Sequence, residues 1–217
     1  MKEKTNSILF YMKHNIFICI IVFFLFPITS SAQTADEMAK ELENLYSKGA
    51  ATSISFTLDG DKNVLTFANN SSKFRIDNSK DLIISDGVTI WHYGKSKKEV
   101  VVDKVDTKGG SLSNIQELIR FSTNYSSVLV KKKHTYELAL TPSQNISKVM
   151  ENIGGISRLN FVFTRSKKGI SISKITARSA KGDIAAGNIK IRSMKKLDNS
   201  LFSFDTPKGV KMIDLRD

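Results

Sequence analysis

The chain of 217 residues contains very little cysteine, histidine or proline. Cys19 is its one cysteine, and it lies inside an apolar segment near the N-terminus. Residues 33–217 therefore offer no disulfide, no thiolate metal site and no cysteine nucleophile. His92 and His134 lack a second ligand at metal-binding spacing. We expect no metal, no cofactor, and histidines that are structural or exposed.

Long apolar runs are also scarce. Residues 16–26 form one such run, which follows three lysines and precedes the small-residue sequence Ser30-Ser31-Ala32. This order is typical of a cleaved secretory signal peptide. The run is shorter than the ~20 residues of a membrane span, which leaves an uncleaved anchor as the alternative. We expect an exported protein with a signal peptide at 1–32 and a single domain at 33–217.

The charge is strongly of one sign. The whole chain carries a net charge of +12, of which residues 1–32 contribute +2, so +10 remains on the expected domain. Such a charge favours anionic partners. The lysines lie singly or in short groups within predicted turns, without the pattern of a recognition helix or an RNA-binding module. We predict no nucleic-acid partner, and solvated hairpin tips or a membrane-facing surface instead.

Most of the chain after residue 51 alternates between apolar and polar residues with period two, which predicts β-strands. Asp59-Gly60 and Asp86-Gly87 separate such runs, and Asp-Gly in this setting predicts a hairpin with a type I′ turn. Serial hairpins predict an antiparallel meander with one buried and one wet face. The clearest alternating sets are Ile54/Phe56/Leu58, Phe74/Ile76, Leu159/Phe161/Phe163 and Ile189/Ile191.

Three segments show helical spacing instead. Thr34 and Glu37 form a capping box at the start of the first. A one-sided sheet needs a cover, so we predict an α+β fold in which a strongly curved sheet is plugged by about three amphipathic helices. Closed barrels and two-layer α+β arrangements are the alternatives. The other two helices are expected around Leu112, Ile115, Leu118 and Ile119, and around Ile146, Val149, Met150 and Ile153.

No catalytic constellation is evident. Ser171 with Lys174, and Ser193 with Lys196, match the bare S-x-x-K pattern of penicillin-recognising enzymes. Those enzymes place the serine at the start of a helix, whereas these residues are predicted to lie on strands, where positions i and i+3 face opposite sides. We therefore predict that the protein is not an enzyme, and keep a periplasmic serine hydrolase using Ser171 or Ser193 as an alternative.

Two segments carry a family resemblance. Residues 83–93 read Ile-Ile-Ser-Asp-Gly-Val-Thr-Ile-Trp-His-Tyr, and residues 201–210 read Leu-Phe-Ser-Phe-Asp-Thr-Pro-Lys-Gly-Val, followed by Ile213-Asp214. In this order, behind a signal peptide, they resemble the hairpin and the C-terminal ending of the outer-membrane lipoprotein carrier (LolA) family. The likeness spans about residues 34 to 215 and is weak between Ser122 and Arg192.

The resemblance implies an unclosed antiparallel barrel with helices as a lid over an apolar cavity. It also implies a periplasmic, monomeric carrier that takes acylated lipoproteins from an inner-membrane ABC transporter and delivers them to an outer-membrane acceptor. Exposing an acyl chain of about 16 carbons to water costs on the order of 12 kcal/mol, so the cargo needs such a shield. A lipid or lipoprotein sensor of the same fold is the alternative.

The cavity residues are predicted from alternation and resemblance together. Trp91 is expected to face inward because His92 occupies the other side of its strand, and the resemblance indicates the same. Where the family commonly has Arg-Pro, this chain has Asn70-Ser71, so the residues that lock the lid are not carried over. The predicted acyl site comprises Phe56, Phe67, Phe74, Ile76, Ile84, Trp91 and Tyr93 from the sheet, and Leu118, Met150 and Ile153 from the helices.

Overall fold

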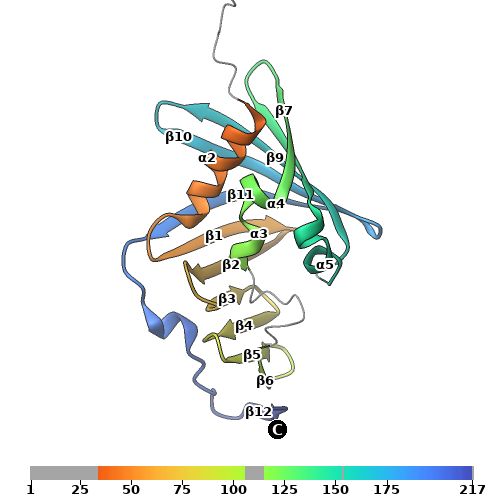
Figure 1. Cartoon of the computed structure of the whole chain (residues 1–217). Helices are drawn as coiled ribbons and strands as arrows, with labels where there is room; N and C mark the ends of the chain where they lie inside the picture. The colour runs from red at the N-terminus through yellow and green to blue at the C-terminus, as the bar shows by residue number, and fades with distance from the viewer. Residues whose placement is uncertain (1–33, 106–114, 153, 217) are drawn as a thin grey trace, which may run out of the picture. The chain divides into compact units, whose positions relative to one another are not determined.

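The computed structural model describes residues 34–105, 115–152 and 154–216. The expected signal peptide, Leu112 and Ile153 lie outside these residues. Within them, 12 strands form one sheet in the order β12-β6-β5-β4-β3-β2-β1-β11-β10-β9-β8-β7. The described strands at the two ends, β12 and β7, do not pair with each other, so the curved sheet stays unclosed (Figure 1). The predicted fold class is confirmed.

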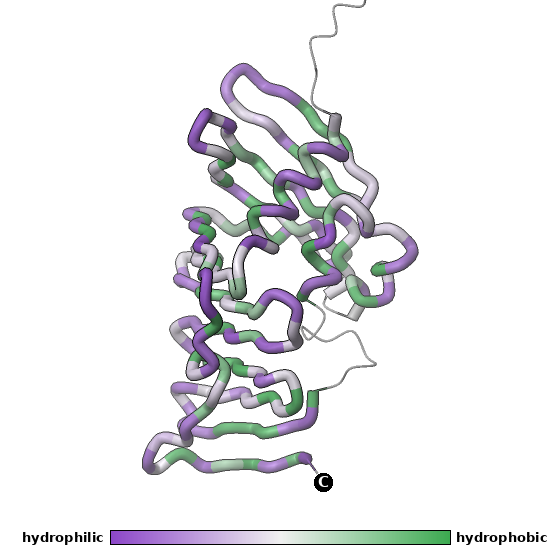
Figure 2. Tube along the Cα trace, turned by 60° about the vertical axis from the view of Figure 1, so that its left-hand side comes forward, coloured by the Kyte–Doolittle hydropathy of each residue, from purple (hydrophilic) through white to green (hydrophobic). Residues whose placement is uncertain are grey.

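All neighbouring strands pair antiparallel except β12, which runs parallel to β6. The strands are β1 (Ala51–Leu58), β2 (Asp61–Ala68), β3 (Phe74–Asp77), β4 (Asp81–Ser85), β5 (Thr89–Gly94), β6 (Glu99–Lys104), β7 (Tyr125–Lys131), β8 (Tyr136–Pro142), β9 (Ile156–Ser166), β10 (Gly169–Ser179), β11 (Gly182–Met194) and β12 (Lys211–Asp214). Figure 2 shows hydrophobic stretches within the strands and hydrophilic residues at many of the turns.

The described residues also contain helices. They are α2 (Ala35–Ser47), α3 (Ile115–Leu118), α4 (Phe121–Asn124), α5 (Gln144–Asn152) and the short 3-10 helix η2 (Asn199–Phe202). The capping box of α2 is confirmed, because Thr34 Oγ1 accepts from the Glu37 N–H at 3.2 Å and the Glu37 carboxylate accepts from the Thr34 N–H at 3.0 Å. No helix of the described residues is both long and apolar enough to span a membrane.

The described part of the second predicted helix is α3, and a further short helix that was not predicted, α4, follows it. The carbonyl oxygen of Glu117 accepts from the Asn124 side-chain amide at 2.8 Å, and that of Leu118 accepts from the Tyr125 hydroxyl at 2.8 Å. These side chains satisfy carbonyl groups that would otherwise need the next helical turn. The described residues therefore contain four α-helices instead of about three.

The two Asp-Gly turns differ. Asp59 and Gly60 have φ of 49° and 85°, which agrees with the predicted type I′ turn. At the second turn only Gly87 has a positive φ, 97°. There the Asp86 carboxylate accepts from the N–H groups of Val88 at 2.8 Å and Thr89 at 2.7 Å. This local side-chain bond fixes an Asx turn, so the type I′ prediction is wrong for Asp86-Gly87.

Bulges produce part of the curvature. Ser55 pairs with Lys190 and Thr57 pairs with Gly187, so β11 has an additional residue opposite β1. Asn188 lies in this bulge with a left-handed φ of 52°. A bulge bends its strand and increases the local twist. A second register shift, between Ile172 and Lys174 of β10, lies opposite β9.

Both faces of the sheet are covered, by different parts of the chain. The helix face is the side against which α2, α4 and α5 pack (Figure 1). The strap, residues 199–210, connects β11 to β12 and includes η2. Its Phe204 contacts the ring of Tyr93, which points away from the helix face, and we call that opposite side the strap face. The buried core of the helix face includes Met38, Leu42, Phe67, Phe121, Leu138, Phe161 and Phe163.

Candidate functional site

Four of the predicted sheet residues lie together on the helix face. Phe67 pairs with Phe74, and Leu65 pairs with Ile76, which places these side chains on one side of β2 and β3. Phe56 lies on the same side of the neighbouring β1. Leu118 from α3 and Met150 from α5 join the same apolar cluster. These six side chains therefore belong to one apolar cluster on the helix face.

Ile84, Trp91 and Tyr93 lie on the opposite face. Ile76 pairs with Ile83, so Ile83 faces the helices and its neighbour Ile84 faces the strap. Ile84 pairs with Trp91, which carries Trp91 and, two residues further, Tyr93 to the same side. The prediction that these three residues share a cavity with Phe74 and Ile76 is wrong. Trp91 is predicted to face the cavity under the helices, but its side chain faces the strap instead.

The error has a physical cause in how the sheet is covered. At β5 the helix face extends beyond the helices, so His92 lies there with its side chain 54 % exposed and 3.1 Å from Asp81. On the strap face, Val100 and Val102 are 0 % and 1 % exposed and pair with Tyr93 and Trp91. His92 does lie on the solvent-exposed side of its strand. At this end of the sheet, however, the solvent-exposed side is the helix face.

The strap face is packed around Ile84, Val100 and Val102. The Tyr93 ring lies 5.8 Å from the Phe204 ring, and Phe202 on η2 is 1 % exposed. Lys73 Nζ donates to the Asn199 side chain at 3.0 Å, which fixes the start of the strap beside β3. This face therefore resembles an ordinary packed core.

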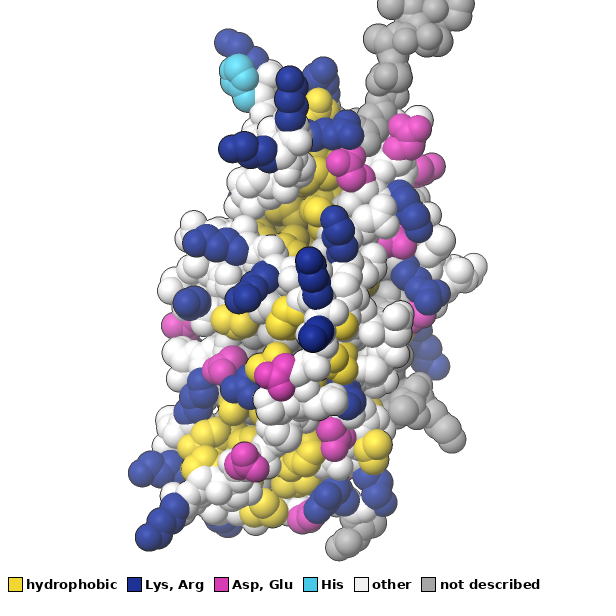
Figure 3. Space-filling view, turned by 90° about the vertical axis from the view of Figure 1, so that its left-hand side faces the viewer, with side chains coloured by type: hydrophobic (Ala, Val, Ile, Leu, Met, Phe, Trp, Pro, Cys, Tyr) yellow, Lys and Arg dark blue, Asp and Glu magenta, His cyan; other side chains and the backbone are white. Residues whose placement is uncertain are grey.

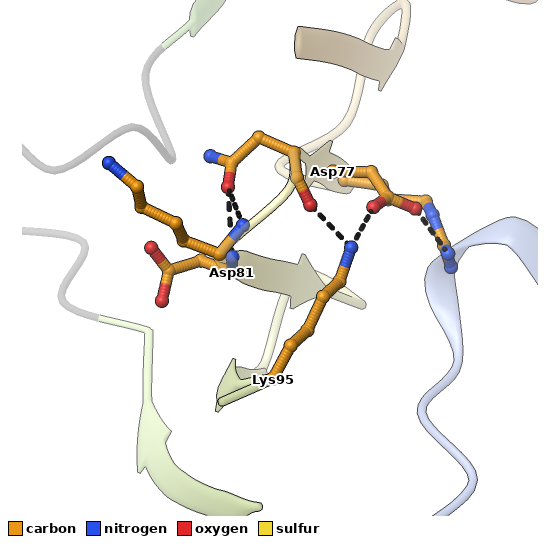
Figure 4. A network of polar contacts seen from close by, with 6 residues as sticks. Asp77, Asp81 and Lys95 are labelled. Atoms are coloured by element: carbon orange, nitrogen blue, oxygen red, sulfur yellow. Dashed lines mark hydrogen bonds and ion pairs between the residues drawn. The ribbon is translucent and has the colours of Figure 1, made fainter. Parts of the chain in front are cut away.

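A polar network links the turns beside the strap face (Figure 4). Lys95 Nζ donates to Asp77 at 2.7 Å and to the Asn78 carbonyl oxygen, and Arg75 donates to the other Asp77 oxygen at 3.1 Å. Asn78 in turn accepts from the Asp81 N–H at 2.8 Å. Burial raises the pKa of Asp77, but donation by Lys95 and Arg75 outweighs it, and the net pKa is lowered. These groups satisfy one another, so we interpret the network as structural.

The helix face contains a hollow between the sheet and the last turn of α2. Its volume is about 230 Å³ and its lining surface is apolar. A second hollow of about 410 Å³ shares Ile189 with it and extends along β10 and β11 toward Lys48. Figure 3, which views the molecule from the left-hand side of Figure 1, shows hydrophobic side chains in a strip with Lys and Arg beside it. The first hollow is lined by Tyr46, Ile54, Phe56, Leu65, Ile175, Ala186 and Ile189.

The predicted acyl residues differ in their relation to this hollow. Phe56 lines it and is half-buried. Phe67, Phe74 and Met150 are 1 %, 2 % and 3 % exposed and belong to the packed cluster beside it. Leu118 is half-buried on the same cluster. Among the predicted residues, Phe56 therefore lines the hollow, whereas Phe67, Phe74 and Met150 lie in the packed core beside it.

The polar ties of the helical cover include one between α2 and α4 and one between α3 and the sheet. The Glu43 carboxylate on α2 accepts from the Ser122 hydroxyl at 2.6 Å and from its N–H at 3.1 Å. Gln116 donates to the carbonyl oxygens of Ala68 and Ser71, each at 3.3 Å, at the turn that contains Asn70-Ser71. Sequence reasoning missed these ties because Glu43 and Ser122 are 79 residues apart and leave no local pattern.

Ionisation of the Glu43 carboxylate affects the contact between α2 and α4. Burial raises the pKa of Glu43, but donation by Ser122 and then by Lys40 outweighs that effect, so the net pKa lies below its usual value. The charged form is therefore the one that the folded protein favours. Neutralising Glu43 weakens the contact between α2 and α4.

Tyr46 is a second residue that the sequence analysis missed. It is 4 % exposed, and its hydroxyl has no hydrogen-bond partner within the described part of the chain. Burial raises the pKa of Tyr46 well above its usual value, so the hydroxyl stays protonated. Met38, Leu42 and Tyr46 continue one i, i+4 row of α2. That spacing could have identified Tyr46 as an inward residue.

The structure gives little support to the alternative of a serine hydrolase that uses Ser171 or Ser193. The bulge in β10 places Ser171 and Lys174 opposite Thr164 and Val162, which share a face of β9, so the expected opposite orientation is wrong. Both side chains are nevertheless exposed. The Ser193 hydroxyl donates to the carbonyl oxygen of Lys48 and so joins β11 to the end of α2. In the described residues, no cluster of His, Cys, Asp or Glu is arranged to hold a metal ion.

Comparison with known proteins finds similarity among solved structures only. No family model matches the chain, and no curated protein matches it. An uncharacterized conserved protein from Thermus thermophilus is similar at 11% identity and a TM-score of 0.46, over 83% of this chain and 98% of its own. A LolA superfamily protein from Nitrosomonas europaea is similar at 10% identity and a TM-score of 0.36, over 80% of this chain and 99% of its own.

Proposed function

We propose that this chain is an exported carrier that shields the acyl chains of lipoproteins between the helices and the helix face of the sheet. The observation that carries the proposal is the hollow beside α2, whose lining surface is apolar although the surrounding protein surface is rich in lysine. An apolar wall of this kind buries methylene groups, and each buried methylene contributes about 0.8 kcal/mol.

The size and position of the space suit a flexible chain. The adjoining hollows have volumes of about 410 and 230 Å³, and ligand sites commonly occupy ~300–1,000 Å³. Their shared residue, Ile189, lies where the bulge bends β11. An acyl chain entering along β10 and β11 would reach Phe56 at the inner end.

The cover is suited to release as well as to binding. Within the cover, α3 and α4 are four residues long each, and the Gln116 side chain joins α3 to the β2–β3 turn. Short elements held by few contacts open locally at lower free energy than the core does. A carrier needs this property, because it must let go of a tightly buried chain.

The partners follow from the resemblance and the predicted leader. In this proposal an inner-membrane ABC transporter supplies acylated lipoproteins in the periplasm, the monomeric carrier binds them, and an outer-membrane acceptor takes them. The lysine-rich surface favours approach to anionic membranes. No catalytic step is required.

The test is to identify what the protein carries. The full chain with its own leader is produced in a Gram-negative host, purified from the periplasm without detergent, and analysed by native mass spectrometry for acylated polypeptides. Ala186→Phe fills the hollow, because Ala186 lines it. Ala185→Phe is the matched control, since Ala185 is exposed and pairs with Thr176 on the other side of β11.

We expect bound acylated polypeptides with the unaltered protein and with Ala185→Phe, and at least about tenfold less with Ala186→Phe, equivalent to about 1.4 kcal/mol. Equal recovery from all three proteins would show that the hollow is not the binding site. Recovery of the protein with no acylated polypeptide, or its retention with an uncleaved leader in the inner membrane, would contradict the carrier role.

A further inference from the structure

Strands β10 and β11 pair along only part of their length, where residues 174–179 lie opposite residues 182–187. Within the described strands, the first part of β10, residues 169–173, has β9 as its only strand partner. The last part of β11, residues 188–194, has only β1. We call the opening between these two parts the seam. The hollow of about 410 Å³ lies here, because residues from both parts line it.

Each strand has a bulge at the point where the two part. Ser173 is the additional residue of β10, between the pairs that Ile172 and Lys174 form with β9. Asn188 lies in the bulge that β11 forms opposite β1. A bulge interrupts the ladder and bends its strand. The seam therefore follows from the register of β10 with β9 and of β11 with β1.

The seam presents two strand edges with unpaired main-chain groups. In an antiparallel strand, alternate residues direct both their N–H and their C=O toward the same neighbour, so about half of the residues on each side direct these groups into the seam. No described strand receives them there. Such an edge is a template for another extended chain. An acyl chain cannot take this place, because its methylene groups form no hydrogen bonds with the main chain.

Five lysines surround the open end of the seam. Two form the turn before β10, two follow β11, and one ends α2 and lines the hollow. In residues 34–105, 115–152 and 154–216, none of the five forms an ion pair with a carboxylate. This charge favours an acidic occupant and opposes a second copy of the chain, which would bring the same lysines. The lysines are Lys48, Lys167, Lys168, Lys195 and Lys196.

We propose that the seam binds an extended, acidic polypeptide segment as an additional β-strand, and that this segment is the part of a carried lipoprotein next to its acyl group. The proposal rests on the proposed carrier function and adds recognition of the cargo's polypeptide to it. Residues 169–173 span roughly 17 Å at ~3.3 Å per residue, so about five residues of the segment can pair.

The acyl chain and the polypeptide do not compete for space in this arrangement. Ile170, Ile172, Ile189 and Ile191 belong to the apolar cluster of the helix face. Strand side chains stand roughly perpendicular to the sheet, whereas the strand edges lie in its plane. The acyl chain can therefore lie on these isoleucines and continue past Ile189 into the hollow lined by Phe56, while the attached polypeptide pairs within the sheet.

The experiment uses the protein purified from the periplasm and three probes. They are palmitamide, the palmitoylated peptide amide Ser-Glu-Thr-Glu-Val-Glu, and the same peptide with an acetyl group in place of the acyl chain. We expect the palmitoylated peptide to bind about tenfold more tightly than palmitamide and to slow amide hydrogen exchange in residues 169–173 and 188–194. Methylation of alternate backbone nitrogens in the peptide should remove this gain, because it removes the N–H groups that pair with an edge.

Charge reversal at the open end tests the acidic character of the segment. Lys168→Glu with Lys196→Glu should remove at least about fivefold of the gain and leave the affinity for palmitamide unchanged. Lys97→Glu with Lys208→Glu is the matched control, since it makes the same change in net charge at exposed lysines of the β5–β6 turn and the strap. The control should bind both probes as the unaltered protein does, and urea midpoints check that all variants are folded.

The outcomes separate this proposal from the carrier function. If palmitamide binds as tightly as the palmitoylated peptide, or the methylated peptide binds as tightly as its parent, the seam adds no strand and only the carrier function stands. If palmitamide fails to bind but the acetylated peptide slows exchange in the seam, the carrier function is wrong and the peptide site stands. Slowed exchange in β7 instead of the seam, or a dimer that protects the seam without peptide, would contradict the proposal.

Discussion

The two faces of the sheet use apolar side chains in opposite ways. On the strap face, Ile84, Val100, Val102 and Phe202 are each at most 1 % exposed, and the charged groups beside them satisfy one another. On the helix face, the wall around Phe56 remains half-open, and the Tyr46 hydroxyl lacks a partner in the described residues. The comparison teaches that the chain itself packs the strap face around these residues, whereas it leaves a half-open apolar hollow on the helix face.

The buried side also changes along the sheet. Phe74 on β3 is 2 % exposed and faces the helices, whereas Ile84 on the neighbouring β4 is 1 % exposed and faces the strap. The helices reach β1 and the β7–β11 end, and the strap covers β3 and β5 toward the β12 end. The two covers therefore bury apolar residues at different parts of the sheet.

The largest expected difference between the faces is in stability. Phe202→Ala should lower the free energy of unfolding by about 3–5 kcal/mol, because it empties a fully buried position of the strap. Phe56→Ala should cost less, under about 2 kcal/mol, because the Phe56 side chain already borders open space. Urea unfolding measures both changes.

Binding of a fluorescent fatty acid should respond in the reverse order. Phe56→Ala weakens it, and the folded fraction of Phe202→Ala binds as the unaltered protein does. If both substitutions cost the same stability and the same affinity, the two faces do not differ in the way described.

A smaller difference is expected in acid. Because the folded pKa of Glu43 lies below its usual 4.5, its stabilising effect is complete above about pH 4.5 and is lost as the pH falls through the folded value. Glu43→Gln should lower stability by about 1 kcal/mol at pH 7 and flatten this part of the acid profile. Urea midpoints measured from pH 6 to pH 3 test the change.

Asp77→Asn is the control for that profile, because the pKa of Asp77 is also lowered but its partners lie beside the strap face. Acid should still weaken fatty-acid binding in Asp77→Asn, and should weaken it less in Glu43→Gln. An unchanged acid profile of binding in Glu43→Gln would mean that the tie to Ser122 does not hold the cover.

Local signals in the sequence predicted local structure well. The capping box at Thr34, the turn at Asp59-Gly60 and the helix around Ile146 and Met150 all depend on residues a few positions apart. Alternation also predicted the curved, helix-covered sheet. These features follow from propensity and periodicity, which act over short distances.

Features that depend on distant parts of the chain were missed. Alternation shows which residues of β5 share a side, but it does not show whether the helices or the strap cover that side. The prediction for Trp91 therefore names the wrong face. The parallel pairing of β12 with β6 joins segments more than a hundred residues apart in the chain. The bulge that turns Lys174 to the side of Ser171, and the missing partner of Tyr46, appear only when the register and the packing are known.

The central claim is that acyl chains enter the helix face and not the strap face, and the single tryptophan tests it directly. Fatty acids brominated near the methyl end quench tryptophan fluorescence only close to contact. In the unaltered protein, Trp91 lies on the strap face, so a bound brominated fatty acid should leave its emission almost unchanged. In the double variant Trp91→Phe, Phe56→Trp, the same ligand should quench the emission in a saturable way that unbrominated fatty acid reverses. Saturable quenching of Trp91 in the unaltered protein, with none in the double variant, would contradict the claim.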